Sequence, residues 1–321
     1  MKIPRSLVEA VRYFQDTDNC LEFMKLIRWP DGVVKCPTCG NDKVGFLAAQ
    51  NRWQCSKKHP KRQFSAKVGT IFEDSAIGLD KWLPAVWQVV NCKNGISSYE
   101  TARGLGVTQK TAWFMNHRIR KAIQSGTFEK ISGEVEADET FIGGLARFMH
   151  KDRRGEKIKG TGGGGKAIVM GLLDRKTKKV RLRHVADTSG PTLQGVVREY
   201  VEGGSYVFSD AWRSYNGLSA DYVHNVIDHA ESYVNGNIHT NGIENFWSLL
   251  KRGIKGTYVS VEPFHLFRYL DEQAFRYNER KNDDGGRFAE AMASIVGRRL
   301  TYKELIGDNL PTPEPSPPTA E

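Results

Sequence analysis

The sequence lacks a long hydrophobic run and an export signal. Among its 321 residues no stretch approaches the roughly eighteen consecutive apolar residues of a membrane-spanning helix, so we expect no membrane partner. Acidic residues occur early in the amino-terminal stretch MKIPRSLVEAVRYFQDTD, and no apolar signal core is present there. We therefore expect a protein that stays in the cytoplasm.

Acidic residues are in the minority. Lys and Arg total 47 against 37 Asp and Glu, which gives a formal net charge of +10. Such an excess favours a polyanionic partner, most often nucleic acid. A solvated basic surface would have the same composition, so charge alone leaves both interpretations open.

Cysteine is scarce and unevenly placed, and three of the five cysteines cluster at Cys36, Cys39 and Cys55. An odd count in a chain without an export signal favours metal binding over a disulfide framework. Cys36 and Cys39 form a Cys-x-x-Cys knuckle, and His59 follows Cys55 after three residues. This spacing predicts a closed tetrahedral site for a structural Zn²⁺ in a short ribbon. The alternative is three reduced thiols and an exposed histidine.

Periodicity predicts the helices and strands. Apolar residues at helical spacing predict one helix over residues 6–28 and more helices between about 78 and 126. Strand patterns occur at residues 134–141, 166–174, 180–185, 205–208 and 222–227. Helical patterns accompany them at residues 191–201, 241–253 and 263–279.

Residues 95–124 predict a helix-turn-helix. Gly106 allows the tight turn, and Thr108 can cap the second helix. The side chains placed to contact base edges in a major groove are Gln109, Lys110 and Thr111. The basic side chains that could then hold phosphates are Arg118, Arg120 and Lys121. Helical hairpins without DNA contacts are common, so a purely structural hairpin stays open as an alternative.

Composition shifts divide the chain into parts. A basic, glycine-rich segment at 143–165 is expected to be a mobile loop, and the Pro-rich end at 308–321 to be disordered. The parts are an N-terminal helical segment (1–32), the zinc ribbon (33–75), the helix-turn-helix region (76–128), an α/β domain (129–282) and a C-terminal segment (283–321).

Three acids in the α/β domain suit phosphodiester chemistry. Two divalent ions about 4 Å apart can stabilise both the attacking and the leaving oxygen, and acidic side chains must hold them. Asp138 lies in the first strand of this domain, Asp210 at or just past the end of another, and Glu244 in a helix. Lys251, seven residues after Glu244, lies on the same helix face and can approach DNA phosphates there.

Several neighbours of these acids compete for the same roles. Alternation puts Glu136 on the strand face of Asp138, and Glu139 directly follows it, so either could be mistaken for the ligand. Asn245, next to Glu244, is a rival third ligand. In the same region, His239 is expected to contact a phosphate or cap the helix, and Trp247 to pack in the core.

Several ordered blocks together resemble the insertion-sequence transposases of the ISXO-like group. The blocks are FSAKVGTIF (64–72), VEADETFIGG (135–144), SDAWRSY (209–215), HTNGIENFWSLLKRG (239–253) and FRYLDEQAFRYN (267–278). The resemblance covers about residues 15 to 280. One departure is local: relatives often close the ribbon with a second Cys-x-x-Cys, whereas here Cys55 is followed by His59, which leaves the fourth zinc ligand open.

The resemblance implies an RNase H-like α/β fold, with a mixed five-stranded sheet and helices on both faces, preceded by the ribbon and the helix-turn-helix. It implies that Asp138, Asp210 and Glu244 bind two Mg²⁺, with Mn²⁺ as an alternative ion, and that Lys251 is the basic helix position. The implied protein is a bacterial, nucleoid-associated DNA transposase. It would bind terminal inverted repeats, hydrolyse the phosphodiester and join the 3′-OH to target DNA.

Two rival functions and the assembly state stay open. Pairing of two element ends implies at least a homodimer. One rival is a DNA-binding regulator with an inactive acidic domain. The other is a nuclease of the same fold that never joins strands.

Overall fold

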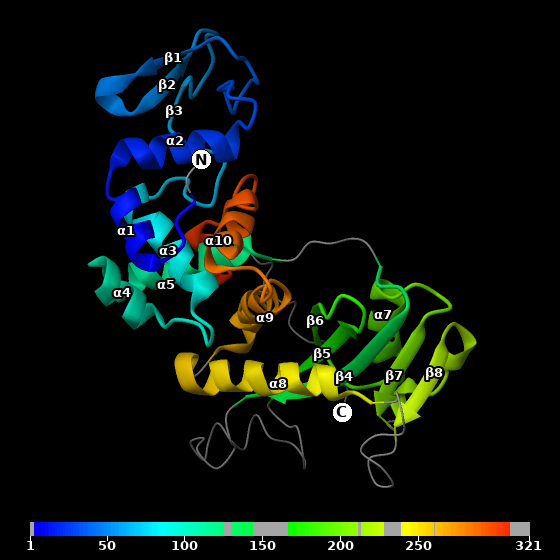
Figure 1. Cartoon of the computed structure of the whole chain (residues 1–321). Coiled ribbons are helices and arrows are strands. Elements are labelled where there is room, and N and C mark those ends of the chain that lie inside the picture. The colour runs from blue at the N-terminus through cyan, green and yellow to red at the C-terminus, as the bar shows by residue number, and fades with distance from the viewer. Residues whose placement is uncertain are drawn as a thin grey trace, which may run out of the picture.

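The protein is described by a computed structural model that covers residues 3–124, 130–143, 166–210, 213–227, 239–259 and 261–308. Figure 1 shows two bodies: an elongated stack that contains the N-terminal helices and the ribbon, and a second body built on a sheet. We call them the N-terminal body and the sheet body. Within these residues no helix combines the length and the apolar character that crossing a membrane requires. The expected loop at 143–165 and tail at 308–321 lie almost wholly outside the described residues.

The ribbon is a small antiparallel sheet, as the spacing of its cysteines predicts. Asn51, in the left-handed conformation with φ of 48°, closes the turn between its first two strands. Trp53 fills its inner face, with ring centroids 5.5 Å from Trp29 and 6.0 Å from Phe64. The strands are β1 (Val44–Leu47), β2 (Arg52–Cys55) and β3 (Gln63–Phe64), in the order β1-β2-β3.

The N-terminal helical segment is two helices, where the periodicity predicts one. Gln15 is the C-cap of the first. Asp16 caps the second, because its side chain accepts a hydrogen bond of 2.8 Å from the backbone N–H of Asp18. The apolar spacing continues through the break, which is why periodicity alone misses it. The helices are α1 (Leu7–Phe14) and α2 (Thr17–Arg28), and α3 (Leu79–Asn91) packs against both.

The two helices predicted within residues 95–124 are α4 (Ser98–Leu105) and α5 (Gln109–Ala122). Ser97 and Glu100 form a capping box at the start of α4. Gly106 turns the chain with φ of 61°, and Thr108 caps α5 by accepting from the N–H of Thr111 at 3.2 Å. The local turn chemistry therefore sets both helix starts.

The C-terminal segment returns to the N-terminal body and is not a separate part of the chain. Phe288 of α10 (Asp284–Ala293) is fully buried, with ring centroids 5.8 Å from Phe14 and 5.7 Å from Phe23. Ring contacts also join Tyr302 of α11 (Tyr302–Ile306) to Phe114 on α5. Burial of these apolar side chains against the N-terminal helices is favourable because it removes apolar surface from water.

The sheet body confirms the predicted mixed five-stranded sheet. Its strands are β4 (Glu134–Ile142), β5 (Ala167–Asp174), β6 (Val180–Val185), β7 (Tyr206–Asp210) and β8 (Val223–Ile227). Their order is β6-β5-β4-β7-β8; β5 is antiparallel to both neighbours, whereas β7 is parallel to β4 and to β8. The central strand, β4, therefore has one antiparallel and one parallel neighbour.

Helices cover both faces of this sheet. On one face, Leu193 and Val197 of α7 (Gly190–Tyr200) pack on Val135 and Leu172. On the other, α8 (Asn241–Gly253) and α9 (Pro263–Asn278) bury Phe246 and Leu270. Figure 1 shows α9 lying between the two bodies. Short helical turns occur at η1 (Ala48–Gln50), η3 (Arg213–Tyr215), η4 (Leu218–Ala220) and η5 (Ile254–Tyr258).

Candidate active site and metal centre

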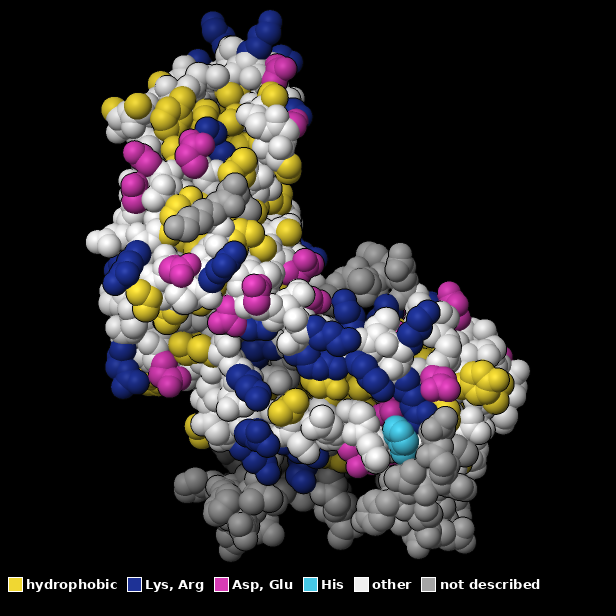
Figure 2. Space-filling model, viewed as in Figure 1, with side chains coloured by type: hydrophobic (Ala, Val, Ile, Leu, Met, Phe, Trp, Pro, Cys, Tyr) yellow, Lys and Arg dark blue, Asp and Glu magenta, His cyan; other side chains and the backbone are white. Residues whose placement is uncertain are grey.

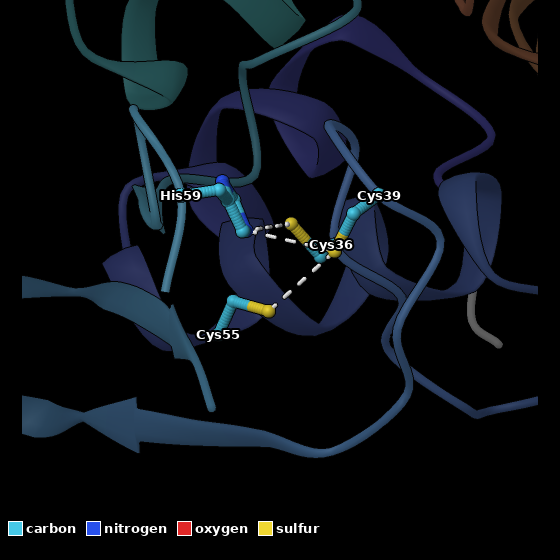
Figure 3. Close-up of side chains that lie close together, drawn as sticks. All are labelled: Cys36, Cys39, Cys55 and His59. Atoms are coloured by element: carbon cyan, nitrogen blue, oxygen red, sulfur yellow. Dashed lines mark hydrogen bonds between the residues drawn. The ribbon is translucent and has the colours of Figure 1, made fainter. Parts of the chain in front are cut away.

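The four predicted zinc ligands converge at the end of the ribbon (Figure 3). Their ligand atoms all lie within 4.8 Å of one another. The Cys39 and Cys55 sulfurs are 3.7 Å apart, and His59 Nε2 is 3.5 Å from the sulfurs of both Cys36 and Cys39. A tetrahedral Zn²⁺ with ordinary bond lengths has edges of about 3.8 Å between sulfurs and about 3.6 Å between sulfur and nitrogen. The four atoms thus fit a structural zinc.

Neighbouring groups orient His59 and lower the thiol pKa of Cys55, and both effects favour metal binding. His59 Nδ1 lies 2.7 Å from the backbone oxygen of Pro60, a contact that leaves Nε2 facing the sulfurs. Burial opposes ionisation of Cys55, but hydrogen bonds from Asn41 and His59 outweigh it and lower the pKa of its thiol to about 6. Because zinc binds thiolates, this shift favours binding near neutral pH. The position of His59 beside the three sulfurs fits it as the fourth ligand.

Two of the three candidate acids lie level on neighbouring parallel strands. The parallel pairing runs from Glu134 and Tyr206 to Glu136 and Phe208. Continued by two residues along each strand, this register brings Asp138 and Asp210 to the same height. The sequence predicts Asp210 either at the end of a strand or just past it. In the structure it is the last residue of β7. The Arg175 guanidinium lies 3.8 Å over the Phe208 ring and also binds Glu136 at 2.9 Å. Phe208 and Glu136 therefore face the same side, and so do the two aspartates.

Helix α8 covers this side of the sheet and carries Glu244. Its first turn is anchored on β4, because the N–H of Ile243 donates to Glu136 Oε2 at 2.9 Å. Three residues after Glu244, Trp247 Nε1 donates to Asp138 Oδ2 at 2.8 Å. Glu244 itself is exposed and accepts a hydrogen bond of 2.9 Å from Thr240. The helix thus holds the third acid beside the first.

Burial and nearby carboxylates raise the pKa values of Asp138 and Glu139. Burial raises the pKa of Asp138 to about 6, and the charges of Asp210 and Glu244 add to the rise. Burial also raises the pKa of Glu139 to about 7, with further contributions from Asp210 and Asp138. Four carboxylates therefore share one electrostatic neighbourhood. In the described part of the chain, however, the Cys and His cluster is the only group of three or more potential ligands whose atoms lie within 4.8 Å.

The contacts of the competing neighbours explain what they do. Glu136 is fully buried, bonded to Arg175 and to the start of α8, so it serves the fold. Glu139 turns to the other face, where the hydroxyl of Tyr215 donates to it at 2.6 Å. His239 does not cap α8, whose N-cap is Thr240. Trp247 is buried as expected, but it also donates a hydrogen bond to Asp138, a contact that the apolar spacing does not reveal.

The predicted DNA contacts differ in their accessibility. Arg118 is only 4% exposed and donates to the backbone oxygens of Ile71, Glu73 and Leu300 at 2.8–3.1 Å. Arg120 is buried as well, so neither arginine is available to bind a phosphate. Both pack between α5 and its neighbours. Lys110 and Lys251 are exposed, whereas Gln109 and Thr111 are half-buried at the start of α5.

Basic side chains also gather where the two bodies meet, as Figure 2 shows. A cleft of about 570 Å³ lies there between α3, α8, α9 and α10. Its lining includes Lys93, Arg280 and Arg287, together with Asn245 of α8. Asn245 thus faces this cleft and not Asp138, which weakens it as the rival third ligand.

Comparison with known proteins identifies both halves of the molecule. Residues 130–278 match the ISXO2-like transposase domain, and residues 15–57 match the transposase zinc-ribbon domain. The chain belongs to the ISXO2-like transposases. Its sheet body accordingly has the RNase H-like architecture that the sequence predicts, and its ribbon carries the structural zinc site.

Two relatives of this transposase extend the match. A protein of the transposable element ISH50 from Halobacterium salinarum is 27% identical over 305 residues, which cover 90% of this chain and 99% of the relative. A transposase-like protein from Haemophilus influenzae is 32% identical over 95 residues, which cover 29% of this chain and 76% of the relative. The first similarity spans the ribbon, helices α4 and α5, and the sheet body together.

Proposed function

We propose that this transposase cleaves and joins DNA with a DDE triad of Asp138, Asp210 and Glu244 that holds two Mg²⁺ or Mn²⁺ ions. The observation that carries the proposal is the level placement of Asp138 and Asp210 on parallel neighbours β4 and β7, under the helix of Glu244. The raised pKa of Asp138 supports it, because clustered carboxylates are an oxygen-donor set suited to hard cations.

In this proposal the acids bind the metal ions and a lysine binds the DNA. When bound, the two ions supply electrostatic stabilisation of the attacking and leaving oxygens. The three acids would hold and orient them on the face of the sheet that α8 covers. Lys251, exposed two turns after Glu244, is suited to bind a phosphate beside the scissile bond. No covalent protein intermediate is required, since positioning and charge are sufficient for phosphoryl transfer.

The N-terminal body is the proposed reader of double-stranded DNA. Lys110 is exposed at the start of α5, with Gln109 and Thr111 beside it, and these side chains would contact the terminal inverted repeats. The basic residues of the cleft between the bodies suit a second stretch of DNA backbone, of the element end or of the target. Two element ends must be paired for joining, so we propose a homodimer or larger assembly on DNA at the nucleoid.

The test is Mg²⁺-dependent nicking of a duplex that carries one end of the element. We expect Asp210→Asn to cut about 10²–10³-fold more slowly than wild type, with unchanged binding of the end, because it loses a metal-holding charge. Asp221→Asn is the matched control: this acid lies in the same body but is exposed and paired with Arg198 at 2.8 Å. It should cut within about twofold of wild type, as expected of a surface pair.

Each rival function has its own outcome in this assay. Equal cutting in a chelator, or by Asp210→Asn, would refute the triad. Binding of the end without any cutting by wild type indicates the regulator. Nicking without transfer of the 3′-OH to a second duplex indicates a nuclease that does not join strands.

A further inference from the structure

The strand position opposite Asp138 is a glycine. Asp138 on β4 is the register partner of Gly171 on β5. A Cβ atom at Gly171 would come within 2.6 Å of two atoms at the far edge of the Trp247 ring, and within 2.9 Å of the Ile243 side chain. Glycine in the interior of a strand weakens it and often marks a close approach. Here the absence of a side chain makes room for the indole of Trp247.

The indole that occupies this space reaches the first acid of the proposed triad. Trp247 is 4% exposed, and its Nε1 donates to Asp138 Oδ2 at 2.8 Å. The backbone N–H of Glu139 donates to the other oxygen, Oδ1, at 2.9 Å. With one donor on each oxygen, the plane of the carboxylate is fixed. Each oxygen still has a second lone-pair direction free to meet a cation.

The same indole ties the third acid to the first. Trp247 follows Glu244 by three residues, so both side chains lie on neighbouring positions of one helix face. At the helix start, the Ile243 N–H is held by Glu136 of β4. The helix of Glu244 is therefore attached to the strand of Asp138 at two points, one turn apart.

We propose that Trp247 is a positioning residue for the metal-holding carboxylates, and that Gly171 provides the space it needs. The inference rests on the proposed function. It differs from simple core packing in one respect: packing requires the ring, whereas positioning requires the ring N–H and its place over Gly171.

The decisive measurement is Mn²⁺ binding to the full-length chain without DNA, by the electron paramagnetic resonance signal of free Mn²⁺. Trp247→Phe keeps an aromatic ring but removes the N–H, and we expect about tenfold or greater loss of affinity, the usual effect of removing a group that orients a metal ligand. The matched control is Trp82→Phe. Trp82 is 1% exposed in the N-terminal body, and its Nε1 donates to Ser75 at 3.0 Å. This control should bind Mn²⁺ as wild type does.

Gly171→Ala tests the same contact from the other side. We expect it to weaken Mn²⁺ binding in the wild-type background, because the added methyl displaces the indole. In the Trp247→Phe background it should cause little further loss, since the shorter ring relieves the closest contacts and the remaining one is with the flexible end of the Ile243 side chain. Thermal melts of each variant report whether the fold is kept.

The outcomes separate this inference from the proposed function. Mn²⁺ affinity of Trp247→Phe within twofold of wild type, or additive losses in the double variant, would overturn the inference. Asp138→Ala serves as the reference. If Asp138→Ala binds Mn²⁺ as well as wild type, the proposed triad itself fails. If it loses binding while Trp247→Phe does not, only the positioning role fails.

Discussion

Two carboxylates in this molecule, one buried and one half-buried, have opposite surroundings. Glu272 of α9 lies where the two bodies meet, paired with Arg276 and with Arg120 at 2.5 Å. Burial alone would raise its pKa, but the two arginines outweigh burial and lower the pKa to about 2. On the central strand β4, burial raises the pKa of Asp138 to about 6, and the nearby charges of Asp210 and Glu244 raise it further.

The difference separates a structural acid from one that is suited to hold a cation. Around Glu272 the chain supplies its own cations, so the charge is neutralised within the fold. Asp138 accepts hydrogen bonds from two uncharged donors, Trp247 and the backbone of Glu139, and its acidic neighbours repel it. Strongly perturbed acids grouped in this way are typical of functional sites. A cation from solution would relieve the repulsion, which is the physical basis of the proposed triad.

The largest expected effect is in the ribbon, because the negative charge of its thiolates also needs a cation that the chain does not supply. Cys55→Ser should lower the zinc content from one per chain to near zero and unfold the ribbon, since a structural zinc contributes on the order of 10 kcal/mol of apparent binding free energy. Zinc analysis by atomic absorption, with limited proteolysis of residues 33–75, measures both effects.

The control for the ribbon is Cys92→Ser, a half-buried cysteine outside the cluster. It should keep its zinc. His59→Ala tests the fourth ligand separately, and we expect it to weaken zinc binding. Full zinc retention in Cys55→Ser would contradict the site.

Removal of the structural acid should have the next largest effect. In Glu272→Gln, Arg120 and Arg276 stay buried without their counter-charge, and we expect a loss of about 3–5 kcal/mol in the free energy of unfolding. Equilibrium denaturation at pH 7.5 measures it. As a control, Glu22→Gln removes an exposed acid paired with Lys25, and should cost less than about 1 kcal/mol. A loss equally small in Glu272→Gln would show that the packing between the two bodies does not depend on this charge.

Most of the fold follows from local sequence signals. Strand β6 has the bounds that its alternation predicts, and β4, β5 and β8 differ from prediction by one residue at an end. Both helices of the helix-turn-helix begin at residues set by side-chain caps. These features depend on neighbours in the chain, which a single sequence contains.

What the sequence misses depends on contacts across the chain. Arg118 is far in sequence from Leu300, whose backbone oxygen it binds, so its burial has no local signature. The return of α10 to the N-terminal body is equally non-local. Gly171 was the one available clue to the Trp247 contact: a glycine inside an apolar strand often marks a close approach. Without the register of β4 and β5, the glycine has no identifiable partner.

The functional acid should show the smallest effect, with a sign opposite to that of Glu272. An unfolded chain has an Asp pKa of about 3.9. Since folding raises the pKa of Asp138, its protonated form contributes stability that is present at low pH and is lost as pH rises through about 6. Asp138→Asn should therefore stabilise the metal-free protein by about 1–3 kcal/mol at pH 7.5, and much less at pH 4. Denaturation at both pH values, with and without Mg²⁺, measures it: added Mg²⁺ should stabilise wild type and not the variant. Should the variant be the less stable protein at pH 7.5 without metal, Asp138 would have to be compensated within the fold, as Glu272 is.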